Sequence, residues 1–568
     1  MTGKQAEQIV KLGSAEKKAE GKDSAGLQQE KGMVSNPHSL SKIVLEALTP
    51  KEVEVTPPRL WGLISGLTVP DLGGRFEIMK HGVSIHDNTA KTKGPKVVNG
   101  WVGDQLKGLG LPPFDFEALI KSFKLHTDRF LTLNRTTSVL SEHSREIAKV
   151  LAGLSKVTSV GDLEDGNLEE KLRDRVLTYV KSENFAKVKD RSCGVSDQVQ
   201  TKGQYMGLGT GIFHNDTFMR RFVEQEYSLM SIVRTLQRGE KPEIKIKPFI
   251  KKEPHKKSKL EEGRYRIISG LDVVPAVLNL ALADELIQHD VAHWRDKPWC
   301  IGADLDHAIF GEHFQRKVGS SPHDKDKSGW DWTVNELDVN FLKMYFEELY
   351  GARSVELAVF MSTFGVGADC TFYLPKGVKL QQKFVGLLKT GWALTLHVNS
   401  VLQVAYQMAY HASKTGKVEL PLRMLAMGDD AVFAEKIGND YNAFWSARGK
   451  IITDASENEK GFCSRRLLEL PDGRWVLQNR NYAKSLFNLC LKKPGDQEFK
   501  QMVQSFVLNF CFLDELLVGR LRDALRDMGF HDAEFDSLLS RAATTRIRGA
   551  PQETIPVDLW EDDPASGK

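Results

Sequence analysis

Two short apolar runs surround the polar triplet Gly428-Asp429-Asp430. Residues 423–427 (RMLAM) precede it, and residues 431–434 (AVFA) follow it. Short apolar runs on either side of a glycine-containing turn are typical of a β-hairpin, and glycine permits backbone angles that other residues resist. The pattern therefore predicts two strands joined by a tight turn, which holds two carboxylates at one edge of a sheet.

Longer stretches of the chain repeat their apolar residues at helical spacing. The clearest case carries leucines on one face and arginines on the other, as expected for a helix that packs on one side only. The apolar pair Ile267-Ile268 instead marks the start of a strand. The predicted helices lie at residues 142–156, 334–350, 395–412 and 512–528.

Composition limits the class of protein. The chain has 568 residues, more than one ordinary domain holds, and a net charge of only +3, so nucleic-acid binding would depend on local basic clusters. Its six cysteines form no CxxC pair, which argues against a zinc site and favours a reduced, cytosolic protein. We expect no signal peptide and no transmembrane segment. The composition of residues 1–35 predicts a disordered tail, and residues 558–568 are expected to form a loose acidic tail.

Carboxylates at two separate places suggest a site for divalent cations. Asp429 and Asp430 lie in the predicted turn, and Asp326 lies at the predicted end of a strand. Mg²⁺ prefers oxygen ligands and keeps several waters, and a two-ion site can clamp both oxygens of an in-line displacement. Asp331 would face another part of the same pocket. The alternatives are a solvated surface turn and a charged loop that enters a helix.

Hydroxyl and amide side chains lie between the two groups of carboxylates. Thr390 and Gly391 precede Thr395, and Asn399 follows Thr395 at the i+4 position, on the same face of a helix. Thr395 and Asn399 can hydrogen-bond a sugar hydroxyl, and Gly391 lets the backbone approach a nucleic acid closely. The alternative is that both polar side chains are satisfied groups on a core helix.

A dense basic stretch precedes these segments. A triphosphate needs several cations to offset its charge, and arginine binds phosphate oxygens in a fixed fork while lysine acts as a point charge. Glu253, inside the stretch, is placed to order the neighbouring cations. The alternatives are a nucleic-acid-binding loop and a localisation signal. The basic members are Lys251, Lys252, Lys256, Lys257, Lys259, Arg264 and Arg266.

In this order, the segments resemble the conserved blocks of a viral RNA-dependent RNA polymerase. The basic stretch, DxxxxD from Asp326, TGxxxTxxxN from Thr390 and the GDD triplet are similar to motifs F, A, B and C of that family. The strings FIKKEPHKKSKL, GRYRIIS, DKSGWDW and FCSRR are most similar to sobemovirus-like and polerovirus-like polymerases. The resemblance covers residues 245–470.

The resemblance implies an α+β fold shaped like a right hand, with fingers, palm and thumb and an antiparallel palm sheet. After the tail at 1–35, the expected segments are fingers with motif F at 36–275, palm with motif A at 276–340, a fingers insertion with motif B at 341–400, palm with motifs C, D and E at 401–482, and thumb with a C-terminal tail at 483–568.

The resemblance also implies roles for individual residues. Asp326 and Asp429 would bind two Mg²⁺ or Mn²⁺ ions, with Asp430 in support. Asp331 and Asn399 would sense the ribose 2′-hydroxyl. The residues expected to assist in nucleotide binding are Thr390, Gly391, Thr395, Lys251, Lys259, Arg264 and Arg266, with Lys259 and Arg266 as the best candidates for triphosphate contacts.

Other positions match the family pattern less closely. Lys450 is the candidate for the general acid of motif D, and Arg448 is its rival. Trp392 is bulky for a loop beside a template, and His255 stands where arginine is frequent. Residues 462–464 resemble motif E, the strand that grips the primer end. Residues 207–211 are either a loop that admits the template or a plain turn.

The implied reaction is template-directed synthesis of a viral RNA genome. Its partners would be an RNA template, a primer or nascent strand, nucleoside triphosphates and other viral replication proteins. We expect the protein in the host cell cytoplasm, with a partner that brings the protein to membranes. One alternative is a reverse transcriptase or DNA polymerase that shares the palm, and another is a non-catalytic RNA-binding replication scaffold. The intact Asp326, Asp429 and Asp430 argue against a decayed site.

Overall fold

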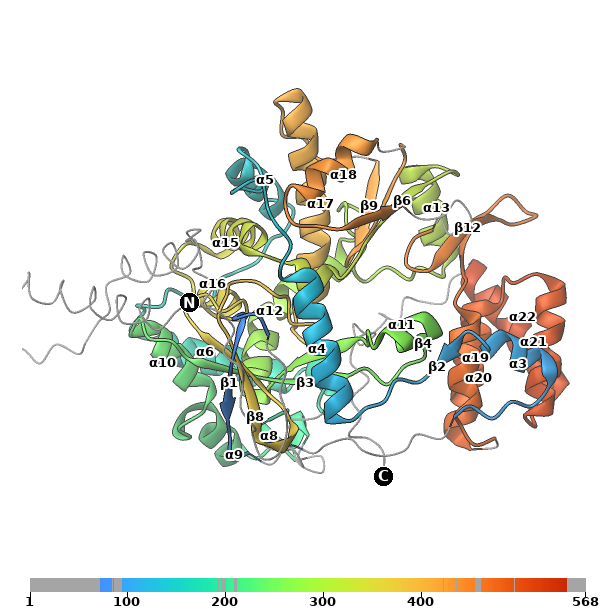
Figure 1. Cartoon of the computed structure of the whole chain (residues 1–568), viewed down its shortest axis with the longest axis horizontal. Coiled ribbons are helices and arrows are strands. Elements are labelled where there is room, and N and C mark those ends of the chain that lie inside the picture. Colours follow the sequence, from blue (N-terminus) through green and yellow to red (C-terminus); the bar gives the residue numbers. More distant parts are fainter. Residues whose placement is uncertain are drawn as a thin grey trace, which may run out of the picture.

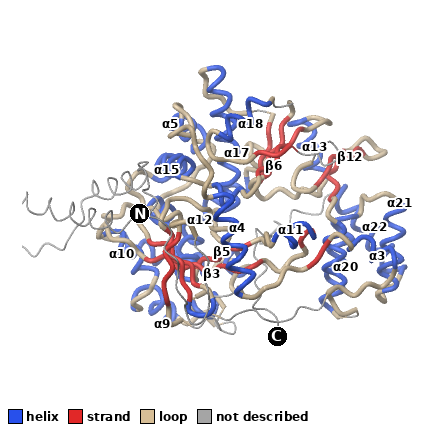
Figure 2. Tube along the Cα trace, viewed as in Figure 1, coloured by secondary structure: helices blue, strands red, loops and turns tan. Residues whose placement is uncertain are grey.

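The computed structural model describes residues 72–83, 85, 94–191, 194–195, 201–208, 212–421, 423–435, 438–454, 461–494 and 496–548. The predicted tails, and residues 209–211, lie outside the described residues. Helices and mostly antiparallel sheets occur together, which confirms the predicted α+β class (Figure 1). Figure 2 shows the strands gathered in distinct sheets among the helices. None of the helices in the described ranges is long and apolar enough to cross a membrane.

One antiparallel sheet carries the Gly428-Asp429-Asp430 turn. Its strands, in order across the sheet, are β11 (Ile452–Asp454), β6 (His323–Lys327), β10 (Asp430–Phe433) and β9 (Met424–Met427). β6 and β10 run antiparallel with Asp324 opposite Val432, so the end of β6 and the start of β10 lie at the same edge. The polar residues of both strands therefore share that edge.

Helices cover both faces of this four-stranded sheet (Figure 1). On one face, Met424 joins the core that includes residues of α17 (Thr395–Thr415) and α18 (Asn439–Ser446). On the other face, Leu425 joins a second core with residues of α13 (Ala308–Val318). Successive side chains of a strand point to opposite faces, which explains why neighbours on β9 reach different cores.

A larger sheet has five strands. In order they are β1 (Phe76–Lys80), β8 (Val378–Gln382), β7 (Asp369–Tyr373), β3 (Glu243–Ile250) and β5 (Ile267–Leu271). All neighbours pair antiparallel except β3 and β7, which are parallel. The predicted strand at Ile267 is confirmed. Two short pairs complete the strands: β2 (Leu109–Gly110) with β4 (His255–Lys256), and β12 (Arg465–Glu469) with β13 (Trp475–Asn479).

The remaining helices follow the chain. They are α3 (Gly100–Leu106), α4 (Phe116–Phe130), α5 (Ser144–Ala152), α6 (Leu168–Val180), α7 (Glu183–Ala186), α8 (Lys202–Tyr205), α9 (Asn215–Met219), the π-helix η2 (Arg220–Glu224), α10 (Leu229–Gln237), α11 (Lys257–Glu262), α12 (Val273–Ala292), α14 (Trp330–Thr333), α15 (Glu336–Tyr350), α16 (Val355–Ser362), the 3₁₀ turn η3 (Pro375–Gly377), α19 (Tyr482–Cys490), α20 (Gln497–Phe510), α21 (Glu515–Asp527) and α22 (Asp532–Arg548).

The four predicted helices are confirmed as α5, α15, α17 and α21, with ends moved by a few residues. α15 begins after Asn335, whose side chain accepts a hydrogen bond from the Leu337 amide at 3.0 Å. α21 begins after Asp514, which accepts from the Leu517 amide at 2.9 Å. Asparagine and aspartate satisfy the free amides of a first helical turn, so both helices begin later than the apolar pattern alone indicates.

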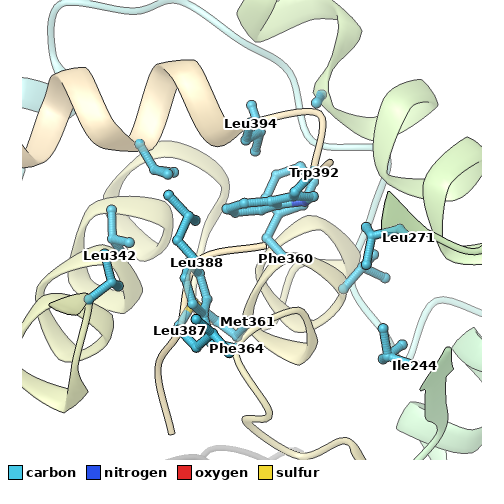
Figure 3. Packing of buried hydrophobic residues seen from close by; sticks show 14 of the residues in the cluster. Ile244, Leu271, Leu342, Phe360, Met361, Phe364, Leu387, Leu388, Trp392 and Leu394 are labelled. Carbon is cyan, nitrogen blue, oxygen red and sulfur yellow. The ribbon is translucent and has the colours of Figure 1, made fainter. Parts of the chain in front are cut away.

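The largest core joins the five-stranded sheet to the helices. Figure 3 shows Phe360 of α16 and Trp392 between Leu342 of α15 on one side and Ile244 and Leu271 of the sheet on the other. These residues come from β3, β5, two helices and the loop before α17. The loop is therefore fixed by packing from several elements.

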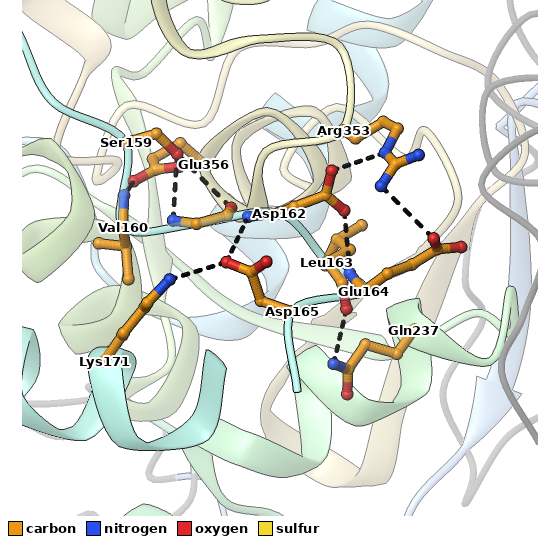
Figure 4. A network of polar contacts seen from close by, with 11 residues as sticks. Ser159, Val160, Asp162, Leu163, Glu164, Asp165, Lys171, Gln237, Arg353 and Glu356 are labelled. Atoms are coloured by element: carbon orange, nitrogen blue, oxygen red, sulfur yellow. Dashed lines mark hydrogen bonds and ion pairs between the residues drawn. The ribbon is translucent and has the colours of Figure 1, made fainter. Parts of the chain in front are cut away.

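A polar network ties the loop before α6 to the start of α16 (Figure 4). The Glu356 carboxylate accepts from the Val160 amide at 2.7 Å and from the Ser159 hydroxyl at 2.8 Å. Arg353 donates to Asp162 at 2.6 Å. The network therefore attaches the α15–α16 connection to the N-terminal helices.

The C-terminal helices form a separate core that includes an N-terminal helix. Val102 and Leu106 of α3 pack among apolar residues of α19 to α22, and Figure 1 shows α3 beside them. The Tyr482 hydroxyl donates to Gln105 at 2.7 Å. Part of the segment predicted as fingers thus packs with the segment predicted as thumb, and the domain boundaries stay a prediction.

Candidate functional site

The Gly428-Asp429-Asp430 turn is held against helix α17. Asp430 pairs with Met427, so Gly428 and Asp429 form a two-residue loop. Gly428 has a φ of +66°, and its amide donates to the Ser400 hydroxyl of α17 at 2.8 Å. A Cβ there would lie 3.3 Å from a side chain of that helix, so both the backbone angle and the close approach favour glycine. The predicted hairpin is confirmed.

Three carboxylates gather at the edge where this turn meets β6. Asp326, Asp429 and Asp430 are exposed residues, although protein atoms enclose Asp429 and Asp430 on their remaining sides. This enclosure and the charge of Asp429 raise the pKa of Asp430 to about 7. Enclosure also raises the pKa of Asp429, and the charge of Asp326 adds to the shift. A raised carboxylate pKa means that the ionised form is costly, so a bound cation would lower that cost.

The donor set suits a hard divalent cation. All candidate ligands are carboxylate oxygens, which Mg²⁺ and Mn²⁺ prefer. In the part of the chain that the structure describes, no three carboxylate, imidazole or thiol side chains converge closely enough to surround one ion. An ion here would therefore draw the carboxylates together, or complete its shell with water and substrate oxygens.

Asp331 and Asn399, which were predicted to act together, are in contact. The Asn399 amide of α17 donates to Asp331 Oδ1 at 3.3 Å, and Asn399 Oδ1 accepts from the Trp330 indole at 2.7 Å. Burial, assisted by the charge of Asp429, raises the pKa of Asp331 to about 7. Asn399 precedes Ser400, whose hydroxyl accepts from the Gly428 amide at 2.8 Å, so this pair lies beside the turn that carries the carboxylates.

Thr390, Gly391 and Thr395 fasten the loop before α17. The Thr390 hydroxyl accepts from the Ser269 amide at 2.9 Å, and the Gly391 amide donates to the Ser269 carbonyl at 3.2 Å. Thr395 donates to the Lys389 carbonyl at 2.9 Å. These bonds attach the loop to β5 and occupy both hydroxyls, and a role of the three residues in nucleotide binding stays a prediction.

Trp392 is a core residue of the same loop. It is 3% exposed, and its indole donates to Asn279 of α12 at 2.7 Å. Its ring contacts Phe360 and Phe364 edge-on (Figure 3). The large side chain of Trp392, which departs from the family pattern, is therefore buried in the core.

The basic stretch forms a turn between β3 and β5, ordered by Glu253 and His255. The Glu253 carboxylate pairs with Lys484 of α19 at 3.0 Å, Lys251 at 3.3 Å and Arg266 at 3.6 Å. His255 Nδ1 donates to the Glu253 carbonyl at 2.7 Å, and its Nε2 accepts from the Arg266 amide at 3.0 Å. The predicted ordering role of Glu253 is confirmed, and the histidine closes the turn.

Lys259 and Arg266 interact electrostatically with the carboxylates of this edge. Burial lowers the pKa of Lys259, and the charge of Asp326 opposes this shift. The guanidinium of Arg266 works against the raised pKa of Asp429. Arg264 instead donates to the carboxylate two residues before it, at 2.8 Å. Lys251, Arg264 and Arg266 each pair with an acidic neighbour. Of the predicted cations, Lys259 and Arg266 also act electrostatically on the carboxylates of the edge.

The ion pairs of Glu253 make a testable contribution to stability. Burial alone would raise its pKa, but Lys484, Lys251 and Arg266 outweigh burial and hold the pKa at about 2, below its ordinary 4.5. A depressed carboxylate pKa stabilises the fold above the ordinary value, and this is lost as the pH falls toward the folded value. We expect Glu253→Gln to lower the Tm at pH 7, and the Tm gap to wild type to close between pH 4.5 and 2. A gap that stays constant over this pH range would contradict the assignment.

Lys450, the predicted general acid, lies in the core. Its side chain is 1% exposed, and Nζ donates to Asp338 at 2.6 Å and to the Thr333 carbonyl at 2.7 Å. It also lies 4.5 Å from the centre of the Trp330 ring. The rival Arg448 donates to a main-chain carbonyl at 2.7 Å. Both cations are engaged by the protein in this arrangement, and the general-acid role stays a prediction.

The segment that resembles motif E begins with a turn, not a strand. Phe462 and Arg465 exchange backbone hydrogen bonds at 2.9 Å, and Cys463 and Ser464 between them have φ of +51° and +60°. Strand β12 begins only at Arg465. Cys463 works against the raised pKa of Asp430, and burial together with the charge of Asp430 raises the pKa of Cys463, so the turn acts on the carboxylate edge.

Buried partners of the site were missed by the motifs. His397, between Thr395 and Asn399 on α17, pairs with Asp290 of α12 at 2.5 Å, and Asp290 also pairs with Lys297 at 2.6 Å. The pair between His397 and Asp290 joins residues 107 positions apart in the sequence, so no local spacing reveals it. Asp338 was missed for the same reason, because its partner Lys450 lies 112 positions later in the sequence.

Comparisons with known proteins agree with the geometry. Residues 315–446, which include motifs A, B and C, match the family model described as viral RNA-directed RNA-polymerase. The chain is 28% identical over 333 residues to the replicase polyprotein P2AB of Cocksfoot mottle virus, covering 55% of this chain and 33% of that protein. It is 26% identical over 449 residues to Protein P1-P2 of Turnip yellows virus, covering 73% and 41%.

A shorter relative is similar as well. The RNA-directed RNA polymerase of Mushroom bacilliform virus is 24% identical over 276 residues, covering 45% of this chain and 62% of that one. The chain thus spans less than two thirds of the length of each of these three relatives. The family match and the relatives confirm the resemblance seen in the motifs, and residues 315–446 are similar to viral RNA-directed RNA polymerases.

Proposed function

We propose that this chain synthesises RNA on an RNA template by two-metal nucleotidyl transfer, and so replicates a viral RNA genome. The observation that carries the proposal is the contact between Asp331 and Asn399 beside the carboxylate edge. This arrangement joins a candidate ribose sensor to a candidate metal centre. The four-stranded sheet would be the palm, the five-stranded sheet with the basic turn the fingers, and the C-terminal helices the thumb.

The side chains would divide the work of nucleotidyl transfer. Asp326 and Asp429 would hold two divalent ions, with Asp430 in support. Bound ions supply Lewis acidity, which favours deprotonation of the attacking 3′-hydroxyl and stabilises the leaving pyrophosphate. Lys259 and Arg266 would hold the triphosphate by charge-assisted contacts.

The direct test is incorporation of labelled ribonucleotides on a short primed RNA template, with Mg²⁺ or Mn²⁺. Product that requires the template supports the proposal. RNA binding without incorporation under both metals would favour the alternative of a non-catalytic scaffold. Equal or better incorporation of deoxyribonucleotides would favour the reverse-transcriptase alternative.

Selection of ribose should depend on Asp331 and Asn399. A hydrogen bond to a charged group contributes about 1.5–3 kcal/mol, so we expect Asp331→Ala or Asn399→Ala to lower the ribo- to deoxyribonucleotide ratio of kcat/KM roughly 10- to 100-fold. The control is Ser413→Ala, at an exposed position on the same helix. An unchanged ratio in both site variants would remove the pair from sugar recognition.

The partners and location follow from the proposed reaction. The chain would bind an RNA template, a primer or nascent strand and nucleoside triphosphates. The relative from Cocksfoot mottle virus is named a replicase polyprotein, which supports work alongside other viral replication proteins. We place this work in the host cell cytoplasm, with membrane recruitment by a partner.

A further inference from the structure

One buried ammonium beneath the carboxylate edge has no hydrogen-bond partner among the described residues. Lys327 follows Asp326 on β6 and is 4% exposed, and its Nζ is without a partner in the described part of the chain. Its Nζ lies 5.6 Å from the ring centre of Trp445 of α18. Lys327 lies opposite Ile452 on β11, so its strand neighbour offers no polar group from the side chain.

Other buried lysines of this protein are paired. Lys297 and Lys450 donate to carboxylates at 2.6 Å, and Lys389 donates to the side-chain oxygen of Gln382 at 2.8 Å. A buried charge without such a partner is costly unless opposite charges nearby compensate it. For Lys327 the compensating charges are mainly those of three carboxylates, Asp430, Asp429 and Asp326, and Asp324 of the same strand contributes least.

The same three carboxylates are the candidate ligands for divalent ions. Lys327 therefore already neutralises part of the charge that an ion would neutralise. A fixed positive charge also repels a second cation, and this repulsion acts over several ångströms when protein lies between the charges. Both effects oppose binding of an ion to the free protein.

We propose that Lys327 is a resident counter-charge of the carboxylate edge. It holds the carboxylates near one another while no ion is bound, and it weakens the binding of divalent ions to the free protein. Ions would then bind firmly only when triphosphate oxygens complete their coordination. The inference rests on the proposed function, because it takes Asp326 and Asp429 as ligands.

The test is the affinity of the free protein for Mn²⁺ at pH 7, without RNA or nucleotide. The electron paramagnetic resonance signal of unbound Mn²⁺ reports this affinity without any catalysis. We expect Lys327→Met to lower the Kd for Mn²⁺ about tenfold or more, since it removes one charge at short range. Lys325→Met, two residues away on the same strand, should leave the Kd within about twofold of wild type.

Thermal unfolding gives a second readout, and Lys327→Gln serves if Lys327→Met does not fold. The gain in Tm on adding Mn²⁺ should be larger in either Lys327 variant than in wild type. If the wild type binds Mn²⁺ and folded Lys327 variants bind it with the same Kd, the inference is overturned and the proposed function stands. No Mn²⁺ binding in wild type, together with no ribonucleotide incorporation, would overturn both.

Discussion

Replacing Asp429 with alanine should abolish ribonucleotide incorporation while leaving the fold intact. A metal site contributes several kcal/mol to transition-state stabilisation, so we expect a loss of about a thousandfold or more. The side chain is exposed at the tip of the β9–β10 hairpin, and removing it relieves repulsion with Asp326 and Asp430. The Tm should therefore not fall. Primer extension and thermal unfolding measure the two effects.

The control for this variant lies on the far end of the same hairpin. Glu435 is 83% exposed just past the end of β10, so Glu435→Ala removes an equal charge far from the turn. It should keep both incorporation and RNA affinity. If Asp429→Ala still incorporates ribonucleotides, the assignment of Asp429 as a metal ligand is wrong. If the variant loses both RNA affinity and Tm, misfolding explains its loss of activity.

Local features of this chain were predictable because they depend on near neighbours in the sequence. The hairpin at Gly428 needs a glycine between two apolar runs, and the strand at Ile267 needs only its own residues. The helix at 512–528 shows its apolar face in its spacing, although Asp514 as a cap moves its start to residue 515. The contact between Asp331 and Asn399 came from the resemblance to a family.

Features that join distant segments were not predictable from pattern. α3 packs with the C-terminal helices, because its apolar face fits a core formed by residues more than three hundred positions later. The pairing of His397 with Asp290 spans two helices. Burial of Lys450 depends on Asp338, which the helical pattern marks only as a polar residue among apolar ones. Charge compensation of this kind arises only in the assembled fold.

Breaking the pair between Lys450 and Asp338 should have the largest effect on stability. Both side chains are at most 1% exposed. Lys450→Met leaves the Asp338 carboxylate buried without its cation, although the Tyr406 hydroxyl still donates to it at 2.8 Å. Removing one partner of a buried pair costs about 3–5 kcal/mol of unfolding free energy, as measured by urea titration. Lys124→Met, which breaks an exposed pair at 2.7 Å, should change it little.

The double variant Lys450→Met/Asp338→Leu separates stability from catalysis. Replacing both members by apolar residues removes the unpaired buried charge, so we expect most of the lost free energy to return. A folded double variant that incorporates ribonucleotides at the wild-type rate would show that Lys450 is a structural residue. A folded double variant with a lower kcat, and a pH–rate profile that has lost its alkaline limb, would show that Lys450 supplies a proton, because a purely structural pair does not set that limb.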